Sequence, residues 1–310
     1  MKIQTTINKQ IRFNKTVILN TAIKKSSFFT KKNKKYFTFD IMKQLSKYIL
    51  ILMLPTFLFL ETSGQENPPL SKEELGKQKS FTDLEVASKN PNDVYILYLT
   101  FREYEEVPEE IFKFKNLQYL SLEGNFIQYL PSKLADLRNL QYINLSQNPR
   151  LFLRQSITVL EQLPNLLSLG LSNNVIYKIP SEIGKLSGLQ LLGLENNHIY
   201  ELPPEIGNLR SLRILYLNDN RLRAVPPEIG NLRSLQVLDL SQNRLAEIPP
   251  EIGNLRNLTE LNLADNILER IPYHILKLNK VKIVNLRNNP KIRNEKYKIN
   301  SLLPNAKVRI

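Results

Sequence analysis

The sequence of 310 residues contains no cysteine. This absence excludes disulfide bridges, metal sites built on thiolates and cysteine nucleophiles together. The ten glycines form no glycine-rich phosphate loop. A long apolar run is also missing, because the most apolar stretch, Tyr48 to Leu60, has 13 residues, whereas a helix that spans a bilayer needs about 20.

Positive charge is concentrated at the beginning of the chain. The formal net charge is +14, and residues 1–41 contain ten Lys or Arg and a single acid, Asp40, so they carry +9. A basic arm for nucleic acid or anionic lipid is one interpretation, and a disordered leader is another. Because the other 269 residues share only +5, we expect no nucleic-acid partner.

A third interpretation follows from what begins at Met42. A short basic segment, Met42–Lys47, precedes the apolar run, and small residues follow up to Gly64. This order predicts a signal peptide over residues 42–64, with cleavage after Gly64 and no stable membrane insertion afterwards. We therefore favour a true start at Met42, with residues 1–41 a mis-assigned upstream stretch, and an exported protein.

An eight-residue sequence recurs in the rest of the chain. It reads Pro-Pro-Glu-Ile-Gly-Asn-Leu-Arg and occupies residues 203–210, 226–233 and 249–256, at an offset of 23 residues. The wider pattern around it is Leu-x-x-Leu-x-Leu-x-x-Asn-x-Leu. A fixed period of about 20 to 29 residues with this spacing predicts a curved solenoid of stacked repeats.

Each repeat is expected to supply one strand and one return segment. Leu215 and Leu217 are two residues apart and share one face of a strand, while Ile214 and Tyr216 point to the other face. Prolines in the return segment remove amide donors, which suits the outer side of the solenoid. The predicted fold is an α/β solenoid, with one parallel concave sheet and an irregular or short-helical convex side.

Nine repeats fill residues 93–289. An asparagine follows every strand but the first, where Arg102 stands. Its carboxamide can donate and accept hydrogen bonds at once, so we expect it to bond to backbone groups of its own turn and of a neighbouring turn. We call these residues the ladder asparagines. In the longer third repeat, Ser156–Leu163 is expected to form a helix on the outer face. The repeats begin at Val94, Leu117, Leu140, Leu166, Leu189, Leu212, Leu235, Leu258 and Val281, and the ladder asparagines are Asn125, Asn148, Asn174, Asn197, Asn220, Asn243, Asn266 and Asn289.

The segments on either side of the repeats have different predicted roles. Residues 65–80 are polar and indicate a linker. Residues 81–92 predict an N-terminal cap helix, since Thr82 and Glu85 have capping-box spacing and Pro91 ends the helix. Residues 290–310 predict a C-terminal cap, with a closing helix over 294–303 and a strand after it.

Side chains that alternate with the structural leucines are expected to line the concave face. Adjacent Leu191, Ile214 and Val237 with tyrosines around them predict an exposed apolar and aromatic stripe, which is typical of protein-binding surfaces. The alternative is that such residues merely suit strands. The candidate partner-binding residues are Tyr98, Tyr119, Tyr142, Leu191, Ile214, Tyr216, Val237, Asp239 and Glu260.

No catalytic or metal site is expected. The two histidines, His198 and His274, fall in different repeats at different phases, so they form neither a dyad nor a metal cluster. Carboxylates such as Glu205 and Glu228 recur because the repeat recurs. We expect no enzyme activity and no cofactor.

The sequence resembles leucine-rich-repeat proteins of the bacterial 23-residue type. The resemblance covers residues 81–310 and includes Asp83-Leu84 with Asn90-Pro91 before the repeats and Leu302–Ala306 after them. Similar repeats occur in Ras-suppressor-like scaffolds. The resemblance implies a secreted or surface-displayed monomer that binds a protein or matrix component, such as a host extracellular protein, in adhesion. The alternative is an intracellular, cytoplasmic scaffold in signalling.

Overall fold

The computed structural model describes residues 69–292 and 296–310. The predictions for the leader, for the signal peptide and for the first residues of the linker concern residues 1–68, outside the described part. In the described part, no helix is both long and apolar enough to cross a bilayer.

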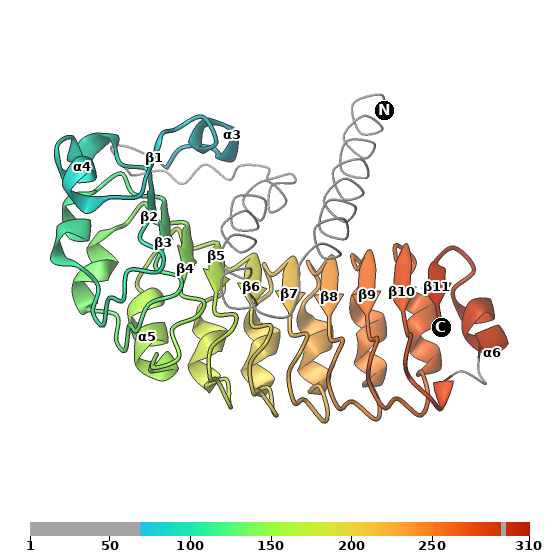
Figure 1. The fold of residues 1–310 in the computed structure, drawn as a ribbon. Coiled ribbons are helices and arrows are strands. Elements are labelled where there is room, and N and C mark those ends of the chain that lie inside the picture. The colour runs from blue at the N-terminus through green and yellow to red at the C-terminus, as the bar shows by residue number, and fades with distance from the viewer. Residues whose placement is uncertain (1–68, 293–295) are drawn as a thin grey trace, which may run out of the picture. The chain divides into compact units, whose positions relative to one another are not determined.

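The described residues form a solenoid with one sheet of eleven parallel strands in sequence order (Figure 1). Each predicted repeat supplies one strand, and each end of the array adds one. The prediction of a single parallel sheet is confirmed. The strands are β1 (Ser80–Phe81), β2 (Ile96–Tyr98), β3 (Tyr119–Ser121), β4 (Tyr142–Asn144), β5 (Ser168–Gly170), β6 (Leu191–Gly193), β7 (Ile214–Tyr216), β8 (Val237–Asp239), β9 (Glu260–Asn262), β10 (Ile283–Asn285) and β11 (Lys307–Arg309).

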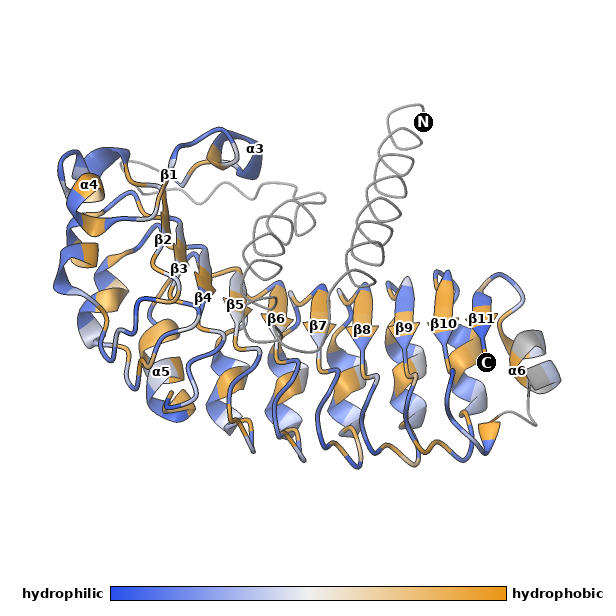
Figure 2. Ribbon diagram, in the orientation of Figure 1, coloured by the Kyte–Doolittle hydropathy of each residue, from blue (hydrophilic) through white to orange (hydrophobic). Residues whose placement is uncertain are grey.

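Side-chain alternation in the strands separates the core from a second face. Leu215 and Leu238, the central residues of β7 and β8, are fully buried, and they pair in register. Their neighbours Ile214 and Val237 point away from the core. We call this second side of the sheet the inner face. Figure 2 shows apolar residues recurring along the array, for example in β6, β7, β8 and β10.

Short 3-10 helices cover the outer side of the core. Each begins after a proline, because a fixed φ suits that position; in η6 the cap is Pro226, with φ −67°. The predicted short-helical convex side is confirmed. The helices are η2 (Glu109–Lys113), η3 (Ser132–Asp136), η4 (Ser181–Lys185), η5 (Pro204–Asn208), η6 (Pro227–Asn231), η7 (Pro250–Asn254) and η8 (Tyr273–Lys277).

Glycine allows neighbouring outer helices to approach closely. A Cβ atom added to Gly230 in η6 would lie 2.5 Å from the backbone oxygen of Glu251 in η7. No side chain fits at that distance. The glycine of the recurring Glu-Ile-Gly sequence is therefore needed for the close packing of successive repeats.

The ladder asparagines join adjacent repeats through buried hydrogen bonds. Asn220 Nδ2 donates to the carbonyl of Leu194 in the preceding repeat at 2.9 Å and to that of Leu217 at 3.1 Å. Its Oδ1 accepts from the backbone N–H of Ile199 at 2.9 Å. One buried side chain thus satisfies three backbone groups, as the double capacity of a carboxamide allows. The predicted ladder is confirmed.

The residue before each ladder asparagine adopts positive φ. It is Asp219 in the sixth repeat, with φ 56°, and Gly124 in the second, with φ 71°. Asn, Asp and Gly tolerate this conformation better than other residues do. Glycine is required at 124 for a second reason, because a Cβ there would meet the ring of Phe101.

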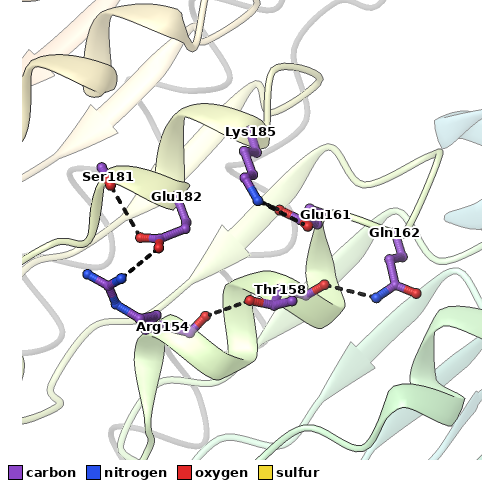
Figure 3. Close-up of polar contacts among 7 residues, drawn as sticks. All are labelled: Arg154, Thr158, Glu161, Gln162, Ser181, Glu182 and Lys185. Carbon is purple, nitrogen blue, oxygen red and sulfur yellow. Dashed lines mark hydrogen bonds and ion pairs between the residues drawn. The ribbon is translucent and has the colours of Figure 1, made fainter.

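The third repeat carries a longer helix, α5 (Leu153–Leu160), on the outer side. It begins three residues before the predicted segment and ends earlier. Arg154 Nη1 lies 2.7 Å from Glu182 Oε1 of η4, and Lys185 Nζ of η4 lies 3.0 Å from Glu161 Oε2 just after α5. Figure 3 shows these two ion pairs bridging the elements. Charge contacts therefore connect the enlarged repeat to the regular array.

The segment predicted as a linker is partly folded. Its second half contains α3 (Lys72–Leu75), capped by reciprocal bonds between Ser71 and Glu74, and the first residue of β1. Leu75 is buried, so apolar burial and a capping box hold this segment in place. The segment predicted as a linker thus includes a capped helix, which the sequence analysis did not predict.

The N-terminal cap continues with α4 (Leu84–Ser88) and η1 (Pro91–Asp93). The capping side chain is Asp83, whose carboxylate accepts from Val86 N–H at 3.0 Å. Thr82 was the predicted cap. The helix therefore begins one residue later than expected, with the stronger acceptor at its first turn.

The C-terminal cap consists of α6 (Lys296–Leu302) and β11. β11 pairs with β10 in parallel, with Ile283 opposite Lys307. Buried Ile299 and Leu303 cover the last repeat. A closing helix followed by a strand is as predicted.

Candidate functional site

The inner face is built from three alternating positions in each repeat. In the first row, each residue is paired in register with the next across nine strands, from Ile96 on β2 to Ile283 on β10. Adjacent strands are about 4.8 Å apart, so the nine span on the order of 40 Å. The structure places all nine candidate residues on this face: Tyr98, Tyr119, Tyr142, Leu191, Ile214, Tyr216, Val237, Asp239 and Glu260.

The exposure of these residues differs from the expected continuous stripe. Ile214 and Val237 are half-buried and Glu260 is exposed, but Leu191 keeps only 7% of its surface exposed. The prediction that Leu191 is solvent-facing is therefore wrong. Alternation along a strand fixes the direction of a side chain, but it does not determine how completely neighbours cover it.

Three tyrosines line the inner face of the first repeats. The ring centroids of Tyr98 and Tyr119 are 5.1 Å apart, and those of Tyr119 and Tyr142 are 6.1 Å apart, with tilted planes. Burial raises the pKa of all three hydroxyl groups, so they remain neutral donors at physiological pH. The three strands thus present a row of aromatic rings with polar tips.

The middle of the inner face is acidic. Burial raises the pKa of Tyr216, and the carboxylates of Glu195, Asp239 and Glu260 raise it further. Asp239 is held in place, since its Oδ1 accepts from Ser241 Oγ at 2.6 Å and its Oδ2 accepts from Asn262 Nδ2 at 2.9 Å. The tyrosine therefore lies among three carboxylates.

Two further acids were not among the candidates from sequence. Glu123 accepts hydrogen bonds from Asn144 Nδ2 at 3.0 Å and Gln147 Nε2 at 2.9 Å, and burial raises its pKa. The pKa of Glu195 is also raised, chiefly by burial. Both stand in the third inner row, where the alternation could have found them.

The histidines are separate, as expected. His198 lies on the turn after β6 with its ring 5.3 Å from that of Tyr177, while His274 belongs to η8 on the outer side. Among the residues that the structure describes, no group of three or more His, Cys, Asp or Glu side chains is arranged to hold a metal ion.

Family models match the repeats. A leucine-rich repeat region model matches residues 152–242 and 204–302, and a leucine rich repeat model matches residues 92–149. Residues 92–302 form a leucine-rich-repeat region. The matched models describe repeats, and neither describes a catalytic domain.

Bacterial structures have the same fold. A leucine-rich-repeat protein of Leptospira interrogans is 30% identical, with a TM-score of 0.59, over 71% of this chain and 62% of its own length. An internalin of Listeria monocytogenes is 22% identical, with a TM-score of 0.56, over 74% of this chain and 70% of its own length, a likeness of fold. The chain thus spans less than two thirds of the Leptospira protein. No curated protein sequence matches.

Proposed function

We propose that this leucine-rich-repeat region binds another protein, or a matrix component, through the inner face of its sheet. One observation carries the proposal. Tyr98, Tyr119 and Tyr142 form an in-register aromatic row, and the row lies on the side of the sheet opposite the core. Packing of the solenoid does not require aromatic side chains there.

The composition and size of the face support this function. Tyrosine is among the residues that dominate binding energy at protein interfaces. The half-buried Ile214 and Val237 supply apolar area beside Tyr216, and carboxylates supply a polar margin. A face on the order of 40 Å long accommodates an interface of standard size, about 800 Å² on each partner.

The site is tested by charging the apolar centre. We expect Ile214→Glu with Val237→Glu to reduce the capture of partner proteins from a host extracellular fraction at least about tenfold, since each carboxylate would be desolvated in the complex. Leu191 is left unchanged because it is buried. Retention is measured by quantitative pull-down.

A matched control carries the same charges on the outer side. Tyr273 and Leu276 in η8 are 63% and 50% exposed, so Tyr273→Glu with Leu276→Glu should capture as much partner as the wild-type protein. Both variants must keep the wild-type circular dichroism spectrum. Equal capture by the wild-type protein and the inner-face variant would place the site elsewhere.

We further propose that the protein is exported. The order of basic, apolar and small residues over 42–64 supports export. Cell fractionation with N-terminal sequencing should find a mature chain that begins at Gln65 outside the cytoplasm. A cytoplasmic product that retains Tyr48–Leu60 would instead favour the intracellular scaffold.

A further inference from the structure

A second group of apolar side chains lies on one edge of the solenoid, on the turns that follow the ladder asparagines of the second to fifth repeats. The six side chains are between 38% and 51% exposed. We call this group the aromatic ridge. Its members are Phe126, Tyr129, Phe152, Val175, Tyr177 and Tyr200.

The repeat pattern does not require this ridge. Phe126 and Val175 directly follow ladder asparagines, and the equivalent residues in the sixth and seventh repeats are Arg221 and Arg244. Both arginines are exposed, and the fold continues unchanged through their repeats. An exposed apolar residue returns at this position in the eighth repeat, Ile267, but the six members of the ridge lie in four consecutive repeats.

Contacts within the ridge hold its aromatic rings. Tyr129 and Phe152 from adjacent repeats stack with centroids 4.7 Å apart and planes at 4°. Lys178 Nζ lies 5.1 Å from the centroid of Tyr200 and 3.2 Å from Glu201 Oε2. Held side chains lose less conformational entropy when a partner covers them.

Two cations that lie beside the rings of the ridge are paired with carboxylates of the same chain. Besides the pair of Lys178 with Glu201, Arg150 lies 5.2 Å from the ring of Phe126 and 3.0 Å from Glu105 Oε1. Each cation thus has a carboxylate partner in the same chain. The ridge therefore offers apolar area whose neighbouring cations are already paired.

We propose that the aromatic ridge is the contact surface of a symmetric homodimer, in which the ridges of two copies pack antiparallel. A two-fold axis matches the ridge with itself. Because the cations beside the ridge are paired within each copy, two copies meet there without unpaired like charges. In the antiparallel arrangement, Arg221 and Arg244 of the two copies lie at opposite ends, away from each other.

The area of the ridge fits a dimer. An aromatic side chain that buries 150–250 Å² in total still exposes about 100 Å² when half-covered. The five rings therefore expose roughly 500 Å² per copy, and Val175 adds slightly less than about 100 Å². Two copies would bury about 1,200 Å², the lower end for stable interfaces. The edge contact leaves both inner faces open, so the dimer would have two binding sites. This differs from the monomer expected from the sequence.

The dimer is tested by sedimentation equilibrium over a range of micromolar concentrations. We expect wild-type protein to reach twice the mass of one chain, and Phe152→Glu with Tyr177→Glu to stay at the mass of one chain. As a milder second variant, Tyr177→Ser with Tyr200→Ser should dissociate at least about tenfold more readily, since both rings lose interface area. Circular dichroism must be unchanged in each.

Added salt should leave the wild-type dimer intact, because its contact is apolar and the cations beside it are paired within each copy. The control is Ile267→Glu with Tyr273→Glu, which charges side chains that are 56% and 63% exposed outside the ridge; this variant should remain dimeric. A wild-type protein that stays monomeric at every concentration, or folded ridge variants that dimerise as well as wild type, would overturn the proposal.

Discussion

The fourth to seventh repeats and the first three repeats build the same sheet with different outer sides. In the regular repeats, glycine brings neighbouring 3-10 helices into backbone contact, as Gly230 does against Glu251. In the first three, Phe112 and Ala135 stand at that position, and α5 replaces one of the 3-10 helices. The sheet and its asparagine ladder thus define the fold, while outer packing varies between repeats.

Substitutions at the ladder position should show the largest difference in the free energy of unfolding between the regular repeats and the first three. Asn220→Ala leaves the buried groups of Leu194, Leu217 and Ile199 without their bonds, and we expect a loss of about 3 kcal/mol in the free energy of unfolding. Arg102 occupies the ladder position of the first repeat, but its side chain is exposed. Arg102→Ala should cost less than about 1 kcal/mol. Urea unfolding measures both, and equal losses would show that the ladder is not the main connection.

Substitutions where the outer 3-10 helices pack together should have an intermediate effect on the free energy of unfolding. Gly230→Ala forces η6 away from η7, and we expect a loss of about 2 kcal/mol, in the range of overpacked sites. The reciprocal change at the equivalent position of the second repeat, Ala135→Gly, meets no such contact and should cost about 1 kcal/mol or less. If thermal unfolding shows Gly230→Ala to be neutral, the close approach does not constrain the regular repeats.

The ion pairs of α5 should matter least. Glu182→Gln removes the partner of Arg154. Because Arg154 stays exposed to solvent, we expect the pair to contribute less than about 1 kcal/mol. The effect should shrink in high salt. Glu228→Gln is the matched control at the same position of the sixth repeat, where the described residues show no ion pair. A salt-independent loss in the Glu182 variant would argue for a packing role.

Much of the fold followed from the sequence because two periodicities agree. The 23-residue period set the repeats, and alternation within each repeat set the register, so Ile214 falls between Leu191 and Val237 as predicted. β1 was missed because two residues are too few to show alternation. α3 has a capping box, Ser71 with Glu74, but its polar surroundings indicated a linker.

The surfaces were harder to predict than the fold. Alternation along the strand predicts the direction of the Leu191 side chain, but it does not predict how completely the neighbouring side chains cover it. The predicted exposure of Leu191 was therefore wrong. The aromatic ridge was missed for a different reason. Tyr129 and Phe152 are 23 residues apart, as are Tyr177 and Tyr200, so the period predicts each pair on adjacent repeats. The exposure and the stacking of these side chains are seen only in the structure. Side chains from separate turns become a surface only in the folded array.

Oxidative footprinting of tyrosines, with and without a captured partner, tests the inner-face proposal most directly. The inner residues Tyr98, Tyr119, Tyr142 and Tyr216 should lose reactivity when the partner binds, while Tyr273 on the outer helix η8 should react as before. Unchanged reactivity of all four inner tyrosines, with protection at Tyr273, would contradict the account.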